Sequence, residues 1–571
     1  MMSGLIWKLL LASACCSLTE VAAQQLVTID TSLGRISGTQ NSIRGDEYSK
    51  FLGIPYGTAE RLQKPEPYGN FASNPLIATS YGSPCPQFSN GQIIGSEDCL
   101  TLNVFTPKRR RRNGLKSVMI WIHGGGLTTG SSDKYPLDVL AAANDVVAVS
   151  LNYRLGAFGF LSSPNDGLPG NYGLWDQQLA IMWVKNNIAD YGGDPNSITL
   201  VGESVGAIAV TYHMISPTTP PNLFHRGITQ SGSAFSLRFQ DIRPEPNFQF
   251  VSTTFGCNGT RDELACIRAI PMNSLLASTP TLMYNPAIDG DFISPLFGEH
   301  LVQFTKDNYL QHGSQGLGNF LNYDILSGWN TMDGLVYVPA VEAINRAITG
   351  QDLSQGISEF VFGEVFKASS RGSFSESADL ITTLALQFYM NEPTPLISKG
   401  RSIDDRRLEA FVNFFGDIGF KIPSITHLQI HSKTSSRRTY AYEFTYNPPG
   451  NGLSGSAGPE WLNAAANHRD EVPFVIGAVL APESICSHTG LARCGRYNRR
   501  EERFATNLMN HWTRFAKTGR LNNKFKQFRF RGGQSYMNLN INGTRRDTYP
   551  RSAAHRFSAG LDEIALRALG I

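Results

Sequence analysis

The 571-residue sequence predicts an α/β fold with a mostly parallel central sheet and helices on both faces. Six apolar runs rich in β-branched residues have the composition of buried parallel strands, at 117–123, 145–153, 197–202, 226–232, 323–329 and 439–444. Between the second and third runs, Leu179, Met182, Trp183 and Asn186 recur at helical spacing, and Gly192-Gly193 ends the helix. Strands that alternate with helices are typical of parallel sheets covered on both sides.

Composition is that of an ordinary globular protein. Apolar residues make up 41%, charged residues 17%, and the formal charge is +3, which does not favour a nucleic-acid partner. The sequence contains no solenoid or propeller repeat and no long low-complexity linker. We therefore expect a single domain over residues 24–571.

The first 23 residues read as a secretory signal peptide. A lysine precedes an apolar stretch from Leu9 to Cys16, and small residues follow up to Ala23, where cleavage is expected. A transmembrane helix is the alternative, but the apolar stretch is shorter than the roughly 18 residues that a span requires. No later segment is long and apolar enough, and the C-terminal segment 561–571 carries charges that a lipid-anchor signal lacks. We expect a secreted, extracellular protein with no membrane span.

Six cysteines remain after removal of the signal peptide. An even number in an oxidising compartment favours disulfides, and three sequential pairs that close short loops are the simplest arrangement. No Cys/His cluster has zinc spacing, so we expect no metal. The six are Cys85, Cys99, Cys257, Cys266, Cys486 and Cys494.

The sequence contains two kinds of candidate surface feature, glycosylation sequons and a basic run. Asn258 and Asn542 each begin an Asn-Gly-Thr sequon and are candidate glycosylation sites. The basic run Lys108–Arg112 lies between two strand-like segments. It is interpreted first as a solvated hairpin tip, with contact to acidic glycans or cleavage by a protease as alternatives.

Ser204 lies in the pattern Gly202-Glu203-Ser204-Val205-Gly206, after a strand-like run and before a helix-like one. A serine in such a stretch can be inert. However, the strand, the tight turn and the helix together match a nucleophile elbow, in which a side chain at either glycine would collide with a neighbouring element. The pattern favours Ser204 as a nucleophile.

A glycine-rich stretch supplies candidate oxyanion donors. The strand 117–123 ends at His123, and three glycines, Gly124, Gly125 and Gly126, follow it. Their N–H groups, with that of Val205, could donate to a tetrahedral intermediate. A plain glycine-rich turn is the alternative, but a position on a separate strand before the elbow is the one that the α/β-hydrolase layout requires.

Spacing alone offers weak candidates for the base and the acid. The α/β-hydrolase order is serine, acid, histidine. His468 lies in a polar loop well downstream of the elbow, and Asp333 lies in a Gly-containing loop after the run 323–329. Both are positions from which a triad can be built.

Several blocks, in order, resemble the type-B carboxylesterases, the family that includes cholinesterases, fungal lipases and neuroligins. The most specific are "SEDCLTLNVFTP" at 96–107 and "YGGDPNSITLVGESVG" at 191–206, joined by "FLGIPYG" at 51–57 and "HRDEVPFVIG" at 468–477. The resemblance extends from about residue 27 to about residue 542. It implies an α/β-hydrolase fold.

The resemblance also implies roles for individual residues. Ser204 is the expected nucleophile, His468 the general base and Asp333 the orienting acid, with Gly125, Gly126 and Val205 as oxyanion donors. It implies disulfides Cys85–Cys99 and Cys257–Cys266, whereas the pair Cys486–Cys494 does not match the cholinesterase spacing. Two positions depart from the family: Val205 replaces a small residue, and Asp333 replaces the more usual Glu.

We interpret the sequence as a secreted serine carboxylic ester hydrolase that acts through an acyl-enzyme and needs no cofactor. Its expected partner is a small-molecule carboxylic ester. The segment 320–338 is similar to the corresponding part of neuroligins, adhesion proteins that have lost the nucleophile. The alternative is therefore an extracellular adhesion or matrix protein with an idle triad, which binds a protein or glycan partner.

Overall fold

A computed structural model describes residues 25–297, 316–337, 387–390, 403–449 and 465–548, except for short gaps at 72–73, 90, 109–113, 237–238, 242–243, 280–281, 490–492 and 532–533. The predicted signal peptide, residues 1–23, lies outside the described residues. So does the basic run beyond Lys108.

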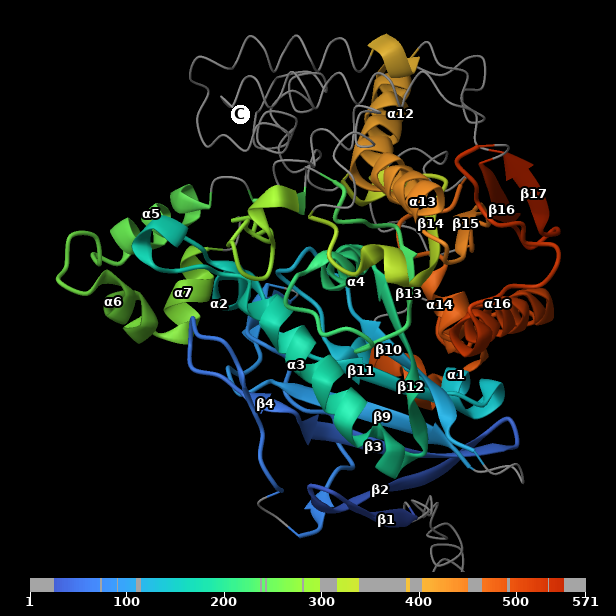
Figure 1. Cartoon of the computed structure of the whole chain (residues 1–571), viewed down its shortest axis with the longest axis horizontal. Helices are drawn as coiled ribbons and strands as arrows, with labels where there is room; N and C mark the ends of the chain where they lie inside the picture. Colours follow the sequence, from blue (N-terminus) through green and yellow to red (C-terminus); the bar gives the residue numbers. More distant parts are fainter. Residues whose placement is uncertain are drawn as a thin grey trace, which may run out of the picture.

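A 13-stranded sheet runs through the molecule (Figure 1). Its centre is parallel and consists of β11, β10, β12, β13, β14, β15 and β16 in that order. The bounds of these strands are β10 Lys116–Ile122, β11 Val147–Leu151, β12 Gly193–Glu203, β13 Arg226–Gln230, β14 Asp324–Asn330, β15 Thr439–Phe444 and β16 Ser535–Leu539. All six predicted runs form central strands.

Antiparallel strands extend the sheet at both edges. On one side β9 pairs with β11 and is followed by β3, β2 and β1, and on the other side β17 pairs with β16. The short strand β6 pairs with β2 in parallel. Two small hairpins, β4–β5 and β7–β8, lie outside the sheet. Their bounds are β1 Leu26–Thr31, β2 Gly34–Ile43, β3 Asp46–Pro55, β4 Gly57–Thr58, β5 Glu66–Pro67, β6 Leu76–Ile77, β7 Gln87–Ser89, β8 Gln92–Ile94, β9 Thr101–Pro107 and β17 Arg545–Thr548.

Helices cover both faces of the sheet, as predicted. Alternate residues of β10 enter two separate cores: Ile120 packs with the residues of α3 and α4, and Trp121 with those of α1, α14 and α16. This alternation produces the three-layer α/β arrangement. The helices are α1 Asp138–Asn144, α2 Gly156–Phe160, α3 Tyr172–Asn187, α4 Val205–Ile215, α5 Glu245–Thr254, α6 Glu263–Ala269, α7 Met272–Ser278, α12 Ile403–Gly416, α13 Ile422–Thr434, α14 Val472–Val475, α15 Glu483–Cys486 and α16 Arg499–Thr518.

The predicted helix after β11 is α3, but its buried face differs from the expected one. Met182 is 38% exposed, whereas Asp176 and Gln177 are fully buried. Asp176 forms an ion pair of 2.6 Å with Arg154, and Gln177 lies 2.9 Å from His213 Nε2. Because Arg154 binds the Asp176 carboxylate and His213 contacts the Gln177 side-chain oxygen, polar residues of α3 pack inside the protein.

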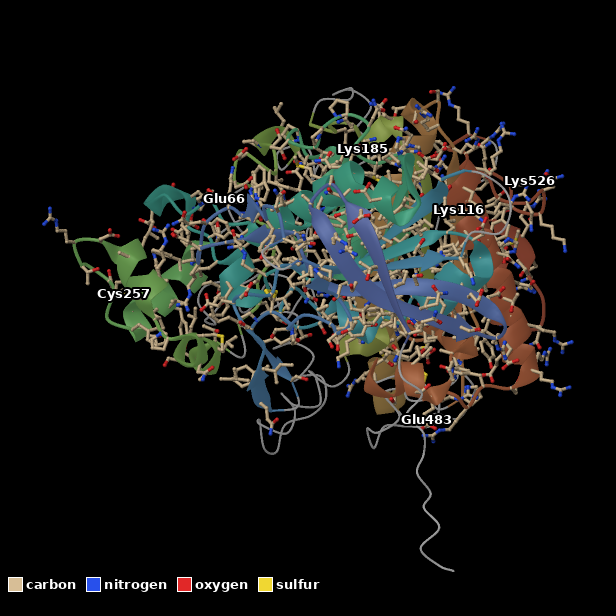
Figure 2. The ribbon with its side chains drawn as sticks, turned by 90° about the horizontal axis from the view of Figure 1, so that it is seen from below. Glu66, Lys116, Lys185, Cys257, Glu483 and Lys526 are labelled. Carbon is tan, nitrogen blue, oxygen red and sulfur yellow. A yellow bond between two sulfur atoms is a disulfide. The ribbon has the colours of Figure 1, made fainter. Side chains whose placement is uncertain are left out.

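Three disulfides pair the cysteines in sequence order. They join Cys85 to Cys99, Cys257 to Cys266, and Cys486 to Cys494. The second closes the lobe of α5, α6 and α7, at the left of Figure 2. Asn258 and Asn542 are both exposed, as an acceptor of a glycan must be.

Within the described ranges, none of the helices has the length and apolar character needed to cross a lipid bilayer.

Candidate active site

Ser204 lies at a strained turn between β12 and α4. Its backbone has φ 58° and ψ −130°, a combination that non-glycine residues adopt only where the surrounding structure enforces it. A Cβ atom on Gly202 would lie 2.3 Å from the carbonyl of Gly206, and one on Gly206 would lie 2.2 Å from the Ile122 oxygen. Both glycines are therefore required, and the predicted elbow conformation is present.

The glycine loop packs directly against the elbow. A Cβ atom on Gly124 would lie 2.8 Å from Glu203 Oε2 and 3.0 Å from Ser204 Cβ. Gly125 has φ 117° and Gly126 has φ 65°. Within the described residues, the N–H groups of Gly125, Gly126 and Val205 donate no hydrogen bond, so they are available to a ligand.

Asp333 and His468 meet although 135 residues separate them. Asp333 Oδ1 lies 2.9 Å from His468 Nδ1, and its other oxygen accepts the Asn330 N–H at 2.8 Å. A hydrogen bond of 2.9 Å from Met332 N to Ala466 O joins the two loops. Both side chains are buried, so the carboxylate fixes which ring nitrogen carries the proton.

The other ring nitrogen faces the residue before the serine. His468 Nε2 lies 3.1 Å from Glu203 Oε1, at an angle that does not make a hydrogen bond, and both Glu203 oxygens are buried without a hydrogen-bond partner among the described residues. Within the same part of the chain, the Ser204 hydroxyl forms no hydrogen bond. Catalytic hydrogen bonds are often long without substrate and shorten in the Michaelis complex.

Buried carboxylates control the protonation of His468. Burial lowers its pKa, but the charges of Glu203 and Asp333 raise it by more, so the net pKa lies above the ordinary 6.5. Burial also raises the pKa of Glu203, against the opposing charges of His468 and Arg469. Burial and Glu203 together raise the pKa of Glu471 to about 7. The protonation of Glu203 and Glu471 is therefore coupled to that of the His468 imidazole.

A network of buried side chains ties the site to the ends of β13 and β14. Glu471 accepts hydrogen bonds from Gln230 Nε2 at 2.9 Å and from Asn330 Nδ2 at 2.5 Å. Gln230 Oε1 in turn accepts the Trp512 indole N–H at 3.0 Å. No local sequence pattern indicates these residues, although Glu471 lies within the block that carries His468.

Aromatic rings border the histidine. The ring of Phe420, between α12 and α13, lies 4.5 Å from the imidazole of His468. Tyr337 stacks on Phe420 at 6.0 Å, and Phe239 lies 5.8 Å from it. No local sequence pattern indicates this wall. It makes one side of the imidazole apolar, which strengthens electrostatic interactions there.

No group of three or more His, Cys, Asp or Glu side chains within the described ranges has the geometry of a metal site. The chemistry available in this region is that of the serine, the imidazole, the carboxylates and the free amides.

Two curated relatives of different kinds match most of the chain. Neuroligin-3 of Mus musculus is 29% identical over 549 residues, which cover 86% of this chain and 61% of that protein. Bile salt-activated lipase of Homo sapiens is 30% identical over 551 residues, 90% of this chain and 66% of the lipase. The chain therefore spans less than two thirds of either relative.

The lipase of Mus musculus is 29% identical and is covered to 82%. A family model described as the carboxylesterase family matches residues 25–558. This match covers the elbow, the glycine loop and the His468 loop together with the sheet that supports them, and the chain accordingly belongs to the carboxylesterase family.

Proposed function

We propose that the protein is a secreted serine carboxylic ester hydrolase. One observation carries the proposal: a buried His468–Asp333 hydrogen bond of 2.9 Å stands beside a strained elbow serine and three free amide groups. The relation to bile salt-activated lipases supports ester hydrolysis, and the three disulfides support an oxidising, extracellular location.

The proposed mechanism uses only groups of this chain. Ser204 Oγ attacks the ester carbonyl while His468 Nε2 accepts its proton, and the amides of Gly125, Gly126 and Val205 bind the oxyanion. The imidazolium then returns the proton to the leaving alcohol, which leaves an acyl-serine. His468 Nε2 then takes a proton from water, which attacks the acyl-serine ester. The carboxylic acid is released, and the proton returns to the Ser204 oxygen. Asp333 holds the imidazole tautomer and stabilises its charged form.

A second candidate is an extracellular adhesion or matrix protein on the same fold. The relation to neuroligins favours it, and so does the position of His468 Nε2 beside Glu203. Such a protein would use its surface and leave the triad idle.

Two measurements on the purified protein separate these candidates. The hydrolase should release p-nitrophenol from p-nitrophenyl acetate continuously. It should also react with a fluorophosphonate probe, and peptide mass spectrometry should find one adduct, on Ser204. An adhesion protein would show neither turnover nor a Ser204 adduct.

The pH profile provides a further prediction. His468 must be neutral to accept a proton, and its raised pKa keeps it protonated to a higher pH than a free imidazole. We expect kcat/KM to fall as the pH drops, with the midpoint above 6.5. Glu203→Gln removes a charge that raises this pKa, so it should move the midpoint to lower pH. The profile from pH 5 to 9 checks both statements, and a midpoint that does not respond to Glu203→Gln would contradict them.

Val205 provides a prediction about specificity. Its side chain is buried beside the elbow and is stiff because it is β-branched. If it narrows the acyl pocket, Val205→Ala should raise kcat/KM for bulky esters roughly ten-fold relative to acetate esters. If it only packs under α4, the substitution should lower the melting temperature and leave the ratio unchanged. The two kcat/KM values, measured with the melting temperature, distinguish these results.

A further inference from the structure

The segment 511–531 is unusually basic. It contains seven Lys and Arg residues and no Asp or Glu, whereas the whole chain has 50 basic and 47 acidic residues. All seven side chains are exposed. We call these residues the basic segment: Arg514, Lys517, Arg520, Lys524, Lys526, Arg529 and Arg531.

The basic segment begins in the last turns of α16 and lies along the amino ends of the central strands. Ala516 O accepts a hydrogen bond of 2.9 Å from Arg226, the first residue of β13. Phe528 N donates to Thr439 O, at the start of β15, at 2.8 Å. Lys433, at the end of α13, lies 4.6 Å from the ring of Phe530. Cations from several elements therefore share this face.

Acidic groups neutralise only part of the face. Asp324 pairs with Arg438 at 3.0 Å, and Asp145 pairs with Lys116 at 2.8 Å. Asp194 also lies near Arg226. In the ranges that the structure describes, no carboxylate pairs with six of the seven cations of the basic segment, and the seventh, Lys517, donates to the Asn144 carbonyl at 2.6 Å. The face keeps an excess of positive charge.

The titration of neighbouring groups supports this excess. Burial lowers the pKa of His511, and the charges of Arg514 and Lys524 lower it further. Burial also lowers the pKa of Arg226; among the neighbouring charges, Asp324 raises this pKa, whereas Arg438 and Arg437 lower it. Like charges thus lie close enough to repel one another, and an anionic ligand would relieve that repulsion.

The chemistry of the face distinguishes between classes of polyanion. None of the strongly exposed apolar side chains belongs to 511–531, so this segment offers nothing to insert into a membrane. Phe525 and Phe528 are buried, and Lys433 covers Phe530, so stacking platforms for nucleic-acid bases are lacking in this segment. Three disulfides favour an oxidising compartment.

We propose that this face binds a linear sulfated polysaccharide. Exposed cations spread over several elements suit a chain of repeated anionic groups, and release of its counterions would supply much of the affinity. The face lies at the amino ends of the strands, whereas Glu203 and Gln230 stand at the carboxyl ends of β12 and β13. Bound polysaccharide would therefore leave the elbow open.

Binding of the full chain to immobilised heparin at several NaCl concentrations tests the proposal. The variant Arg520→Gln/Arg529→Gln removes two cations of the basic segment, and adding Lys524→Gln/Lys526→Gln removes four. The matched control, Arg261→Gln/Arg268→Gln, removes two exposed arginines beside the Cys257–Cys266 disulfide. Figure 2 shows Cys257 on the opposite side of the ribbon from Lys526.

We expect the quadruple variant, Arg520→Gln/Lys524→Gln/Lys526→Gln/Arg529→Gln, to bind heparin on the order of ten-fold more weakly than the wild type at physiological salt. The dependence of its affinity on salt should also be smaller. The heparin affinity of the double variant Arg520→Gln/Arg529→Gln should lie between those of the quadruple variant and the wild type. The heparin affinity of the control variant should stay within about two-fold of that of the wild type, and all variants should have the melting temperature of the wild type. If the two double variants lost the same amount of heparin affinity, the effect would depend on net charge alone and not on the basic segment, and the proposal would be overturned. Tighter wild-type binding to phosphatidylserine vesicles or single-stranded DNA than to heparin would also overturn it.

Discussion

Ser204→Ala should lower kcat/KM for p-nitrophenyl esters by on the order of 10^4-fold or more. The substitution removes the only atom that forms the proposed acyl bond, and the amides and His468 can assist only the slower attack of water. The fold should persist, because the strain of the elbow comes from the backbone and from Gly202 and Gly206. Steady-state kinetics and the melting temperature of the variant check both expectations.

Ser233 provides a matched control. Its hydroxyl lies 3.3 Å from His427 Nδ1, so the chain contains a second buried serine beside a histidine. Burial lowers the pKa of His427 to about 3, and within the described residues no carboxylate orients that ring. Ser233→Ala should keep most of the activity. If Ser204→Ala were as active as the wild type, the nucleophile assignment would be wrong and the adhesion candidate would gain support.

The centre of the sheet could be predicted best where its strands are apolar and buried on both faces. The run 117–123, for example, became β10, Lys116–Ile122, in which every residue from Val118 to Ile122 is apolar and buried. Edge strands such as β1, Leu26–Thr31, were not predicted, since each of their residues is exposed or half-buried and the apolar signal is weak. In α3 the helix was predicted but its buried face was not, because Asp176 and Gln177 are buried against Arg154 and His213, which lie outside the helix.

Some residues of the candidate site could likewise be predicted from local sequence, and others could not. The elbow and the glycine loop could be identified from local sequence, because glycine is required wherever a Cβ atom would collide with backbone. Glu203, Phe420 and Glu471 could not be assigned a function, since each matters only through residues far away in the chain. Glu203 lies 3.1 Å from a histidine 265 positions later, a proximity that no local pattern carries.

Asp333→Asn should lower kcat by roughly 10^3- to 10^4-fold while the fold remains intact. The carboxylate accepts the Nδ1 proton at 2.9 Å and so leaves Nε2 free to act as a base. An asparagine that presents its NH2 group to Nδ1 would favour the opposite tautomer, in which Nε2 carries the proton. Kinetics with p-nitrophenyl acetate over the pH plateau measure the loss.

Stability separates this effect from general damage. The charge of Asp333 contributes to raising the pKa of both Glu203 and Glu471, so the three carboxyl groups repel one another when ionised. Asparagine removes that repulsion and can still accept the Asn330 N–H through its oxygen. The melting temperature of Asp333→Asn near neutral pH should therefore not fall.

Asp333→Glu is the conservative counterpart. It keeps a carboxylate and restores the residue that is more usual in this family, so it should retain far more activity than Asp333→Asn, with a loss that reflects only the altered reach of the side chain. If instead Asp333→Asn kept full activity, the acid would have to be another carboxylate near His468.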